Sequence, residues 1–146
     1  MTNSTLNKIF LSEAGIAALV LRVPVGLILA AHGAQKLFGW FGGNGLAGTA
    51  GWMSSIGIEP GYLMAILAGS AEFFGGLALV LGLLTRPAAV VAAFTMIVAI
   101  FSVHIGNGLF ASNNGYEYAL TLLVVLVSLA IQGGGYLSLD NQLAKK

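Results

Sequence analysis

The sequence predicts an all-α integral membrane protein, built as a four-helix bundle with both termini in the cytoplasm. Hydrophobic residues make up 58% of the chain and charged residues only 8%, against about 25% charged residues in soluble domains. Four apolar runs are separated by short stretches rich in Gly, Asn and Pro, and the first two runs are long enough for a helix to cross a bilayer core of about 30 Å. We therefore expect one membrane domain over residues 1–146, with spans at about 14–38, 62–84, 88–104 and 116–132.

The first span follows a polar N-terminal segment, residues 1–13, in which Ser12 is the expected N-cap of the helix. Pro24 lies inside the span and removes one backbone hydrogen bond, which a packed bundle tolerates. The span also contains three chargeable side chains, which are Arg22, His32 and Lys36. Such side chains are costly in lipid, so we expect them to lie inside the bundle or at its ends.

The connection after the first span is rich in glycine and aromatic residues. Residues 39–45 predict a flexible loop, and the apolar stripe in residues 46–56 predicts a short helix. Trp40 and Trp52 belong to this region, and Trp side chains gather at the level of the lipid headgroups. We therefore expect a short interfacial helix in the first outer loop.

The second span carries one carboxylate, Glu72, near the middle of the apolar run 62–84. A helix over that run would be roughly 33 Å long, which places Glu72 near the middle of the bilayer. An ionised carboxylate is costly there unless it is paired or protonated. Spacings of three and four residues put Ala65, Gly69 and Gly76 on the same face, and these small residues let another helix backbone approach closely. Glu72 is therefore expected to face inward.

The third span is expected to begin directly after a tight turn at residues 85–87, and the fourth follows a loop rich in Gly and Asn. The tail beyond residue 132 leaves the membrane. In a four-span chain, most basic residues outside the spans lie on the side of the termini: Lys8, Arg86, Lys145 and Lys146. Lys36, at a helix end, lies on the other side, so the positive-inside rule places both termini in the cytoplasm.

Counting depth from the cytoplasmic ends of the spans separates the polar groups into two layers. Arg22 and Glu72 form the inner layer, at roughly 12 and 18 Å, and a long arginine side chain can bridge that difference. We expect a buried Arg22–Glu72 ion pair that docks the first helix on the second, either as a structural pair or as part of a site. Lys36 is expected to snorkel to the interface or to contact a ligand.

The outer layer contains His32, His104 and Glu117, which are expected to converge from three helices. His104 and Glu117 lie near span ends, where the alternative is simple hydration. His32 is about a turn and a half inside the bilayer and needs a polar partner there. Glu72 and His32 are the candidate residues for proton exchange with a ligand, and the candidate ligand contacts are Arg22, Lys36, His104 and Glu117.

Composition excludes several classes of function. A net charge of +1 gives no electrostatic basis for binding a nucleic acid. The chain has no cysteine, which excludes thiolate metal sites and dithiol chemistry, so electron transfer would need a bound cofactor. A quinone suits such a site. Haem or a metal ion is less well supported, because no ligand-spacing motif joins the candidate ligands His32, His104, Glu72 and Glu117.

Several motifs follow one another along the chain: Arg22, the segment His32-Gly33-Ala34-Gln35-Lys36-Leu37-Phe38-Gly39, the pattern Gly69-x-x-Glu72-x-x-Gly75-Gly76, the segment Gly82-Leu83-Leu84-Thr85-Arg86, and Ser138-Leu139-Asp140. Together they resemble the DoxX family of small bacterial and archaeal membrane proteins, from about residue 19 to residue 140. The tail departs from the family pattern, because it lacks the Pro and Arg that many relatives carry before Ser-Leu-Asp.

The resemblance implies a four-helix protein of the bacterial or archaeal inner membrane. Some relatives are described as a subunit of a thiosulfate:quinone oxidoreductase or of a terminal quinol oxidase, and others as membrane anchors of oxidative-stress complexes. Most are simply named as oxidoreductases. Enzymatic activity of this chain therefore rests on the resemblance alone.

Two functions of different classes are expected. In the first, the protein is an accessory redox component that binds a quinone-like ring among its helices near Glu72 and His32, which exchange protons with the ring. In the second, it is a non-catalytic anchor or scaffold whose outer loops, residues 39–61 and 106–115, dock a membrane or periplasmic partner or a second copy of the chain. The lipid bilayer is the partner common to both. A transporter is the least supported class, because four short spans offer few polar positions.

Overall fold

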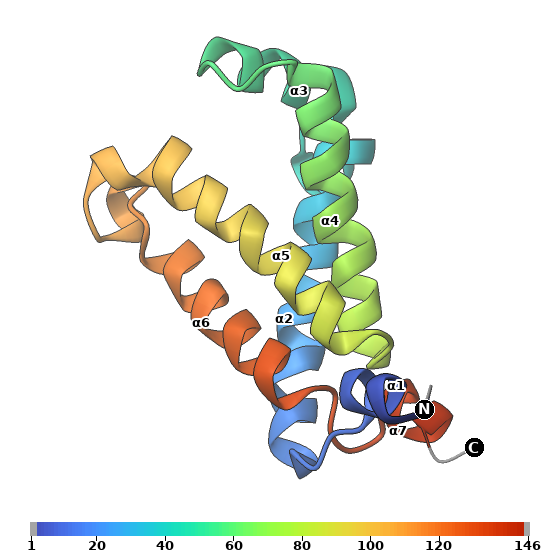
Figure 1. The fold of residues 1–146 in the computed structure, drawn as a ribbon. Helices are drawn as coiled ribbons and strands as arrows, with labels where there is room; N and C mark the ends of the chain where they lie inside the picture. The colour runs from blue at the N-terminus through green and yellow to red at the C-terminus, as the bar shows by residue number, and fades with distance from the viewer. Residues whose placement is uncertain (1–2, 145–146) are drawn as a thin grey trace.

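A computed structural model describes residues 3–144, and these residues form helices joined by short loops (Figure 1). The α-helices in this part of the chain are α1 (Asn3–Phe10), α2 (Gly15–Phe38), α3 (Gly45–Ser55), α4 (Gly61–Leu81), α5 (Thr85–Ala99), α6 (Glu117–Gln132) and α7 (Leu139–Ala144). Shorter helical turns lie between them, namely η1 (Trp40–Gly42), the π-helical turn η2 (Ile100–His104), η3 (Ile105–Asn107) and η4 (Ala111–Asn113).

Three helical segments are long and apolar enough to cross a membrane. They are α2, α4 and the continuous segment Thr85–Asn107, which runs from α5 through η2 and η3. α6 is also apolar but shorter, with 16 residues and a length of about 24 Å. The prediction of an all-α protein with several membrane-spanning helices is confirmed.

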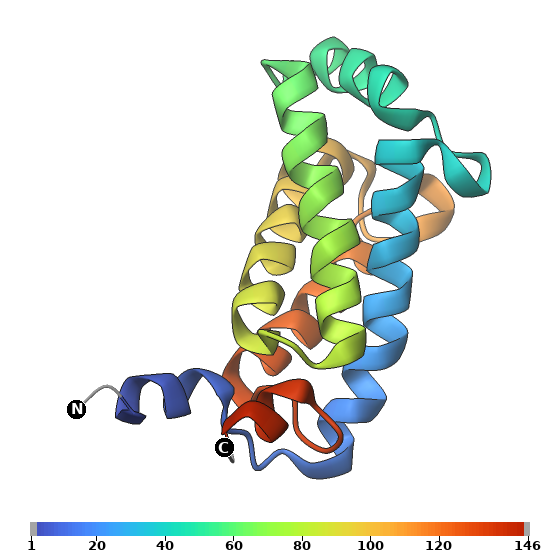
Figure 2. The ribbon, with the colours of Figure 1, turned by 90° about the vertical axis from the view of Figure 1, so that its right-hand side faces the viewer.

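The long helices lie side by side in two pairs, α2 with α4 and α5 with α6 (Figures 1 and 2). α1 and α7 lie together at one end of the molecule, and α3 lies across the other end, next to the start of α4. Toward the α3 end, α5 and α6 lean away from α2 and α4 (Figure 1). The helices are therefore closely gathered at the end that carries α1 and α7 and spread apart at the other.

The turn between α4 and α5 lies earlier in the chain than the sequence predicts. α4 ends before Gly82, whose left-handed conformation (φ 65°) terminates the helix. α5 then begins at Thr85, among the residues expected to form the turn. The physical reason is a cap from the C-terminal tail: the Asp140 carboxylate accepts the backbone N–H groups of Leu84 and Thr85 at 2.6 and 2.8 Å. Pro87 fits in the first turn of α5, where its missing N–H leaves no helical bond unmade.

The polar N-terminal segment packs against the C-terminal tail. Its helix α1 was not expected, and Ser12 is not the N-cap of α2, whose N-cap residue Ala14 makes no side-chain capping bond. The buried Ser12 hydroxyl instead donates to the carbonyl of Gln132 and accepts the N–H of Gly135. The Ser12 backbone also exchanges two hydrogen bonds with the Asn141 side chain, so this contact holds the two ends of the chain together.

α2 and α4 pack backbone to backbone through facing glycines. A Cβ atom on Gly26 would lie 2.6 Å from the carbonyl oxygen of Gly76. A Cβ atom on Gly33 would lie 2.6 Å from Phe73 Cα and 2.7 Å from the carbonyl oxygen of Gly69. The prediction that small residues on this face of α4 admit another helix is confirmed, and α2 is that helix. The contacts set the register, with Gly26 beside Gly76 and Gly33 beside Gly69.

Replacing Gly33 with alanine should destabilise the protein by about 1–3 kcal/mol, because the new methyl group meets backbone atoms that cannot rotate away. The measurement is the melting temperature of the protein in detergent. Gly75→Ala is the matched control on α4, since a Cβ there meets only the carbonyl of Ala88, at 3.8 Å. A Gly33→Ala protein that melts as high as Gly75→Ala would contradict this helix contact.

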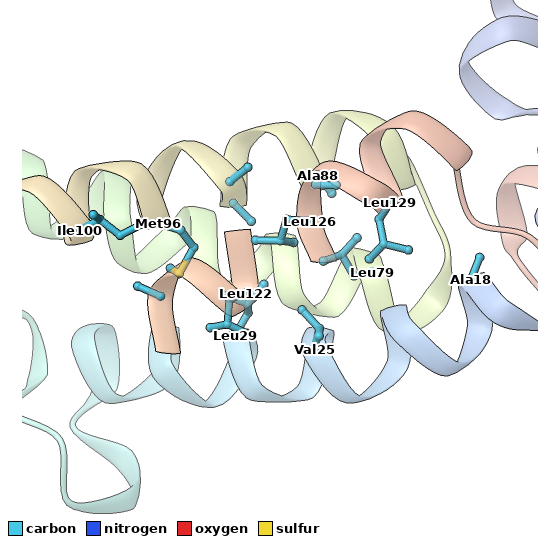
Figure 3. Close-up of a cluster of buried hydrophobic side chains, with 14 residues drawn as sticks. Ala18, Val25, Leu29, Leu79, Ala88, Met96, Ile100, Leu122, Leu126 and Leu129 are labelled. Carbon is cyan, nitrogen blue, oxygen red and sulfur yellow. The ribbon is translucent and has the colours of Figure 1, made fainter. Parts of the chain in front are cut away.

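The apolar core lies where α2, α4, α5 and α6 meet (Figure 3). Leu79 of α4 and both Leu126 and Leu129 of α6 are fully buried there, and Leu29 of α2 is nearly so. Alanines on α5 complete the contact and let α6 approach closely. Many large apolar side chains lie outside this core on the exposed faces of the helices, which suits contact with lipid.

Candidate functional site

The carboxylate in the middle of α4 is paired with a lysine. The Glu72 side chain is 6% exposed, and Lys36 Nζ, near the end of α2, donates a hydrogen bond to Glu72 Oε2 at 2.6 Å. The predicted inward orientation of Glu72 is confirmed. The predicted partner is wrong, because Lys36 and not Arg22 pairs with Glu72. The expectation that Lys36 snorkels to the interface is wrong for the same reason.

Helix register and side-chain direction decide which cation reaches Glu72. In the register set by the glycines, Arg22 lies level with Val80, to whose carbonyl it donates. Val80 is eight residues from Glu72, or about 12 Å along α4. Side chains on a helix also lean toward its N-terminus. Arg22 therefore extends away from Glu72, whereas Lys36 extends back along α2 toward it.

Arg22 instead joins three separate segments of the chain at the end that carries α1 and α7. Its side chain is buried, and its guanidinium donates to four backbone carbonyls, those of Leu79, Val80, Gly134 and Tyr136, at 2.5–3.1 Å. The Leu79 and Val80 carbonyls belong to the last turn of α4, and the other two to the tail. Arg22 is therefore a structural cation that fastens the tail to the helices.

The Ser-Leu-Asp motif of the tail belongs to the same structural contact. Asp140 caps α5, and its own backbone N–H donates to the carbonyl of Gly82 at 2.9 Å. Ser138 packs so closely on the same turn that a Cβ on Gly82 would lie 2.6 Å from Ser138 Cβ and 2.9 Å from Arg22 Cζ. Two motifs far apart in sequence thus converge on Gly82, at the opposite end of α4 from α3.

A cleft of about 590 Å³ is lined mainly by residues of α4 and α5, with others from α2, α3 and η2. Its wall is mainly apolar, and its residues are Trp52, Met53, Ile58, Met64, Leu67, Ala68, Ala71, Val91, Phe94, Thr95, Val98, Ala99 and Val103, with Lys36, Glu72, His104 and Asn114. Cavities of about 300–1,000 Å³ with a few polar groups are typical of small-molecule sites. The Lys36–Glu72 pair is thus part of the wall of an apolar, ligand-sized cleft.

His104 gives the cleft wall a second polar group. It closes the π-helical turn η2, and short π-helical turns of this kind are frequent at functional sites. Its Nδ1 donates to the carbonyl oxygen of Asn114 at 2.8 Å. In the neutral ring this bond leaves Nε2 as a hydrogen-bond acceptor. The cleft therefore offers a donor at Lys36 and an acceptor at His104.

The structure places His32 and Glu117 outside the cleft wall. His32 is half-buried, and its ring centroid lies 6.1 Å from that of Tyr118 on α6, with the ring planes tilted by 47°. Glu117 accepts the backbone N–H of Ala111 at 2.7 Å, which fastens the loop before α6. The expected convergence of His32, His104 and Glu117 is therefore not observed.

The structure gives no support to metal ligation by this set. Within residues 3–144, no three His, Asp or Glu side chains gather closely enough to hold a metal ion. His32, His104, Glu72 and Glu117 thus do not form a common ligand shell. Each has a separate neighbour. His32 lies beside the ring of Tyr118, and His104 binds the carbonyl of Asn114. Glu72 pairs with Lys36, and Glu117 accepts the N–H of Ala111.

One signal in the sequence could have found the correct ion pair. Gly26 and Gly33 are seven residues apart on the first span, and Gly69 and Gly76 are seven apart on the second. Matching the two pairs in antiparallel order gives the observed register, and that register separates Arg22 from the middle of α4. The apolar wall of the cleft has no comparable signal, because its residues come from separate helices whose spread is a property of the packed structure.

Comparisons with known proteins agree with this arrangement of apolar helices. The family model described as DoxX matches residues 17–105. A Bacillus subtilis protein named "Putative oxidoreductase CatD" is 34% identical over 125 residues, which cover 86% of this chain and 85% of that protein. The Escherichia coli inner membrane proteins YqjF and YphA are 32% and 30% identical, over 93% and 87% of this chain and 97% and 90% of their own. No solved structure matches the chain.

Proposed function

Since this chain belongs to the DoxX family, we propose that it is a small redox component of the membrane that binds a quinone-like ring in the cleft between α4 and α5. Its apolar helices and its relatives make it a multi-pass protein of the inner membrane. The observation that carries the proposal is the Lys36–Glu72 pair in the wall of an otherwise apolar cleft. The name of the Bacillus relative agrees with a redox role.

The chemistry of the wall suits a ring that carries oxygen at both ends. An ammonium group can donate three hydrogen bonds. Lys36 donates one of them to Glu72, so it can also donate one to a ring carbonyl. His104 Nε2 can accept from a ring hydroxyl at another point of the wall. The predicted role of His32 stays a prediction, and its position beside Tyr118 favours Lys36 over His32 as the ligand contact.

The proposal includes four membrane spans with both termini in the cytoplasm. Support comes from the contact between α1 and α7, which puts both ends of the described chain at one end of the molecule, so that α6 makes the return crossing. Lys8 and Arg86 lie at that end, whereas Lys145 and Lys146 lie outside the described residues. α3, at the other end, would lie in the interface with Trp52 exposed toward the headgroups.

Filling the cleft should remove the ligand without unfolding the protein. We expect Ala68→Phe to lower the amount of quinone that copurifies in mild detergent by about tenfold or more, because its ring would occupy the space of the ligand. Ala17→Phe is the control, since it makes the same change on an exposed face of α2. The measurement is a native mass spectrum, with quinone extraction from the same samples. Equal quinone in both variants, or none in the wild type, would contradict the proposed site.

A membrane anchor is the second candidate function, and the observation that favours it is a row of aromatic rings, most of them exposed, that runs from η1 to the middle of α4. Phe38 contacts both Trp40 and Phe73, with ring centroids 5.0 and 5.1 Å apart, and Phe74 continues the row from Phe73 at 5.2 Å. Trp40 and Phe74 are more than half exposed. In the same native mass spectrum, a partner protein or second copy without any small ligand would support the anchor.

A further inference from the structure

A second cavity, of about 330 Å³, lies beside the cleft at the α3 end. It is formed by the end of α2, the loop before α3, and α3 itself. We call it the outer vestibule, and its residues are Gln35, Gly42, Gly43, Asn44 and Thr49, with Lys36 and Trp52. Lys36 and Trp52 also belong to the wall of the cleft, so the two cavities meet at these side chains.

The wall of the outer vestibule is more polar than that of the cleft. Its wall carries the amides of Gln35 and Asn44 and the hydroxyl of Thr49. Thr49 is only 6% exposed, and its Oγ1 donates to the carbonyl of Lys36 at 3.2 Å. Gly43 holds the loop tightly against α2, because a Cβ there would collide with the backbone of Gln35. A cavity of this size with these polar groups in its wall has the room and the hydrogen-bonding partners to hold several water molecules.

Lys36 lies between the two environments. Its side chain is 25% exposed, whereas the carboxylate that it binds is 6% exposed. Glu72 contributes to the cleft wall but not to the vestibule wall. Lys36 therefore contributes to both walls, while its partner Glu72 contributes to the cleft wall alone.

We propose that the outer vestibule is a water-filled route from the α3 face of the membrane to Lys36, and that the Lys36–Glu72 pair exchanges protons with that face through it. This inference rests on the proposed function, because the route would supply protons to a ligand in the cleft or remove them from it. For proton uptake, Lys36 passes a proton to Glu72, Glu72 passes it on to the ligand in the cleft, and the neutral amine takes a proton from a hydronium ion in the vestibule. For proton release, each of these transfers runs in reverse. No electron moves in this step. The other titratable groups near the pair are His32 on α2 and His104 in η2, and α3 contributes none.

Cysteine labelling tests the route without any ligand, and the chain has no native cysteine to interfere. A charged, membrane-impermeant thiosulfonate reagent is added to spheroplasts, which expose the outer face of the inner membrane. We expect Thr49→Cys and Gln35→Cys to react about tenfold or more faster than their neighbours Ala50→Cys and Ala34→Cys. Ala50 and Ala34 lie outside both cavity walls. Ala50 is nearly as buried as Thr49, at 4% against 6% exposed, so position in the vestibule wall is what separates this pair.

Two vestibule positions are used so that a folding defect in one variant does not decide the result. Thr49→Cys loses one hydrogen bond, but Gln35 is only partly buried and tolerates the change. Equal rates at vestibule and neighbour positions would overturn the proposal. So would reaction only in inverted vesicles, where the reagent meets the cytoplasmic face.

A thiol at position 36 measures whether protons from the outer face reach that position. In the Lys36→Cys/Glu72→Gln protein the thiolate is the reactive form, so the labelling rate reports loss of the thiol proton. We expect this rate to rise with the pH outside the spheroplasts at constant internal pH. A rate that follows only the internal pH would overturn the proposal.

The labelling result and the ligand result are independent of each other. Vestibule labelling without a copurifying quinone would contradict the proposed function and support the aqueous route. A quinone bound in the cleft with no vestibule labelling would contradict the aqueous route and support the ligand site.

Discussion

Replacing Lys36 with methionine should cost the folded protein about 3–5 kcal/mol, because it leaves a buried carboxylate without its cation. Methionine keeps most of the length and apolar contact of the lysine stem, so the loss reports the charge and not the packing. The measurement is the free energy of unfolding in detergent, together with the amount of protein that accumulates in the membrane. A Lys36→Met protein as stable as the wild type would show that Glu72 is not held by this pair.

The reciprocal and double variants separate the pair's structural and functional roles. Glu72→Gln should cost less than Lys36→Met, because the remaining lysine side chain is 25% exposed and water can solvate its charge. The double variant Lys36→Met/Glu72→Gln removes both charges and should recover most of the lost stability. If the pair serves the proposed function, the stable double variant still loses its copurifying quinone. A double variant that is stable and keeps its quinone would show that the pair has a structural role only.

Arg22→Met should also be strongly destabilising, by about 3 kcal/mol or more, since four backbone carbonyls lose their donor in a buried place. Two of these carbonyls belong to the tail, so the tail should detach from the α4–α5 turn. Limited proteolysis after Gly134 would report that detachment, alongside the melting temperature. The quinone content of protein that still folds should be unchanged, because Arg22 lies at the other end of α4 from the cleft.

Arg86→Met is the matched control for this change. Arg86 donates from one nitrogen to the carbonyls of Ile9 and Leu11, but it is partly exposed, so water can replace it. We expect a loss of about 1 kcal/mol at this position. Equal losses for Arg22→Met and Arg86→Met would contradict the role of Arg22 as the buried fastening of the tail.

The overall class of this protein follows from local properties of the sequence. Hydropathy and length identify α2 and α4 as membrane helices, because a helix that lies in lipid needs apolar side chains along its whole length. The inward position of Glu72 follows as well, since its neighbours at helical spacing are small. None of these conclusions requires knowledge of which helix packs against which.

The capping of α5 shows where such local reasoning stops. Thr85-Arg86-Pro87 has the composition of a turn, yet it forms the first turn of a helix because Asp140, more than fifty residues away in sequence, caps it. Ser12 likewise has the composition of an N-cap but binds Gln132 and the tail instead. A polar residue takes the partner that folding brings near it, and that partner can come from any part of the chain.

By itself, therefore, the sequence determined that this is an all-α protein of the membrane with a buried carboxylate at its centre. Only the tertiary structure decided that Lys36 pairs with Glu72, that Arg22 fastens the tail, and that a cleft lies between α4 and α5. The physical reason is that hydropathy adds up along one helix, whereas an ion pair depends on the register between two helices and on the direction in which their side chains lean. The cleft depends on side chains from several helices, which only folding brings to one place.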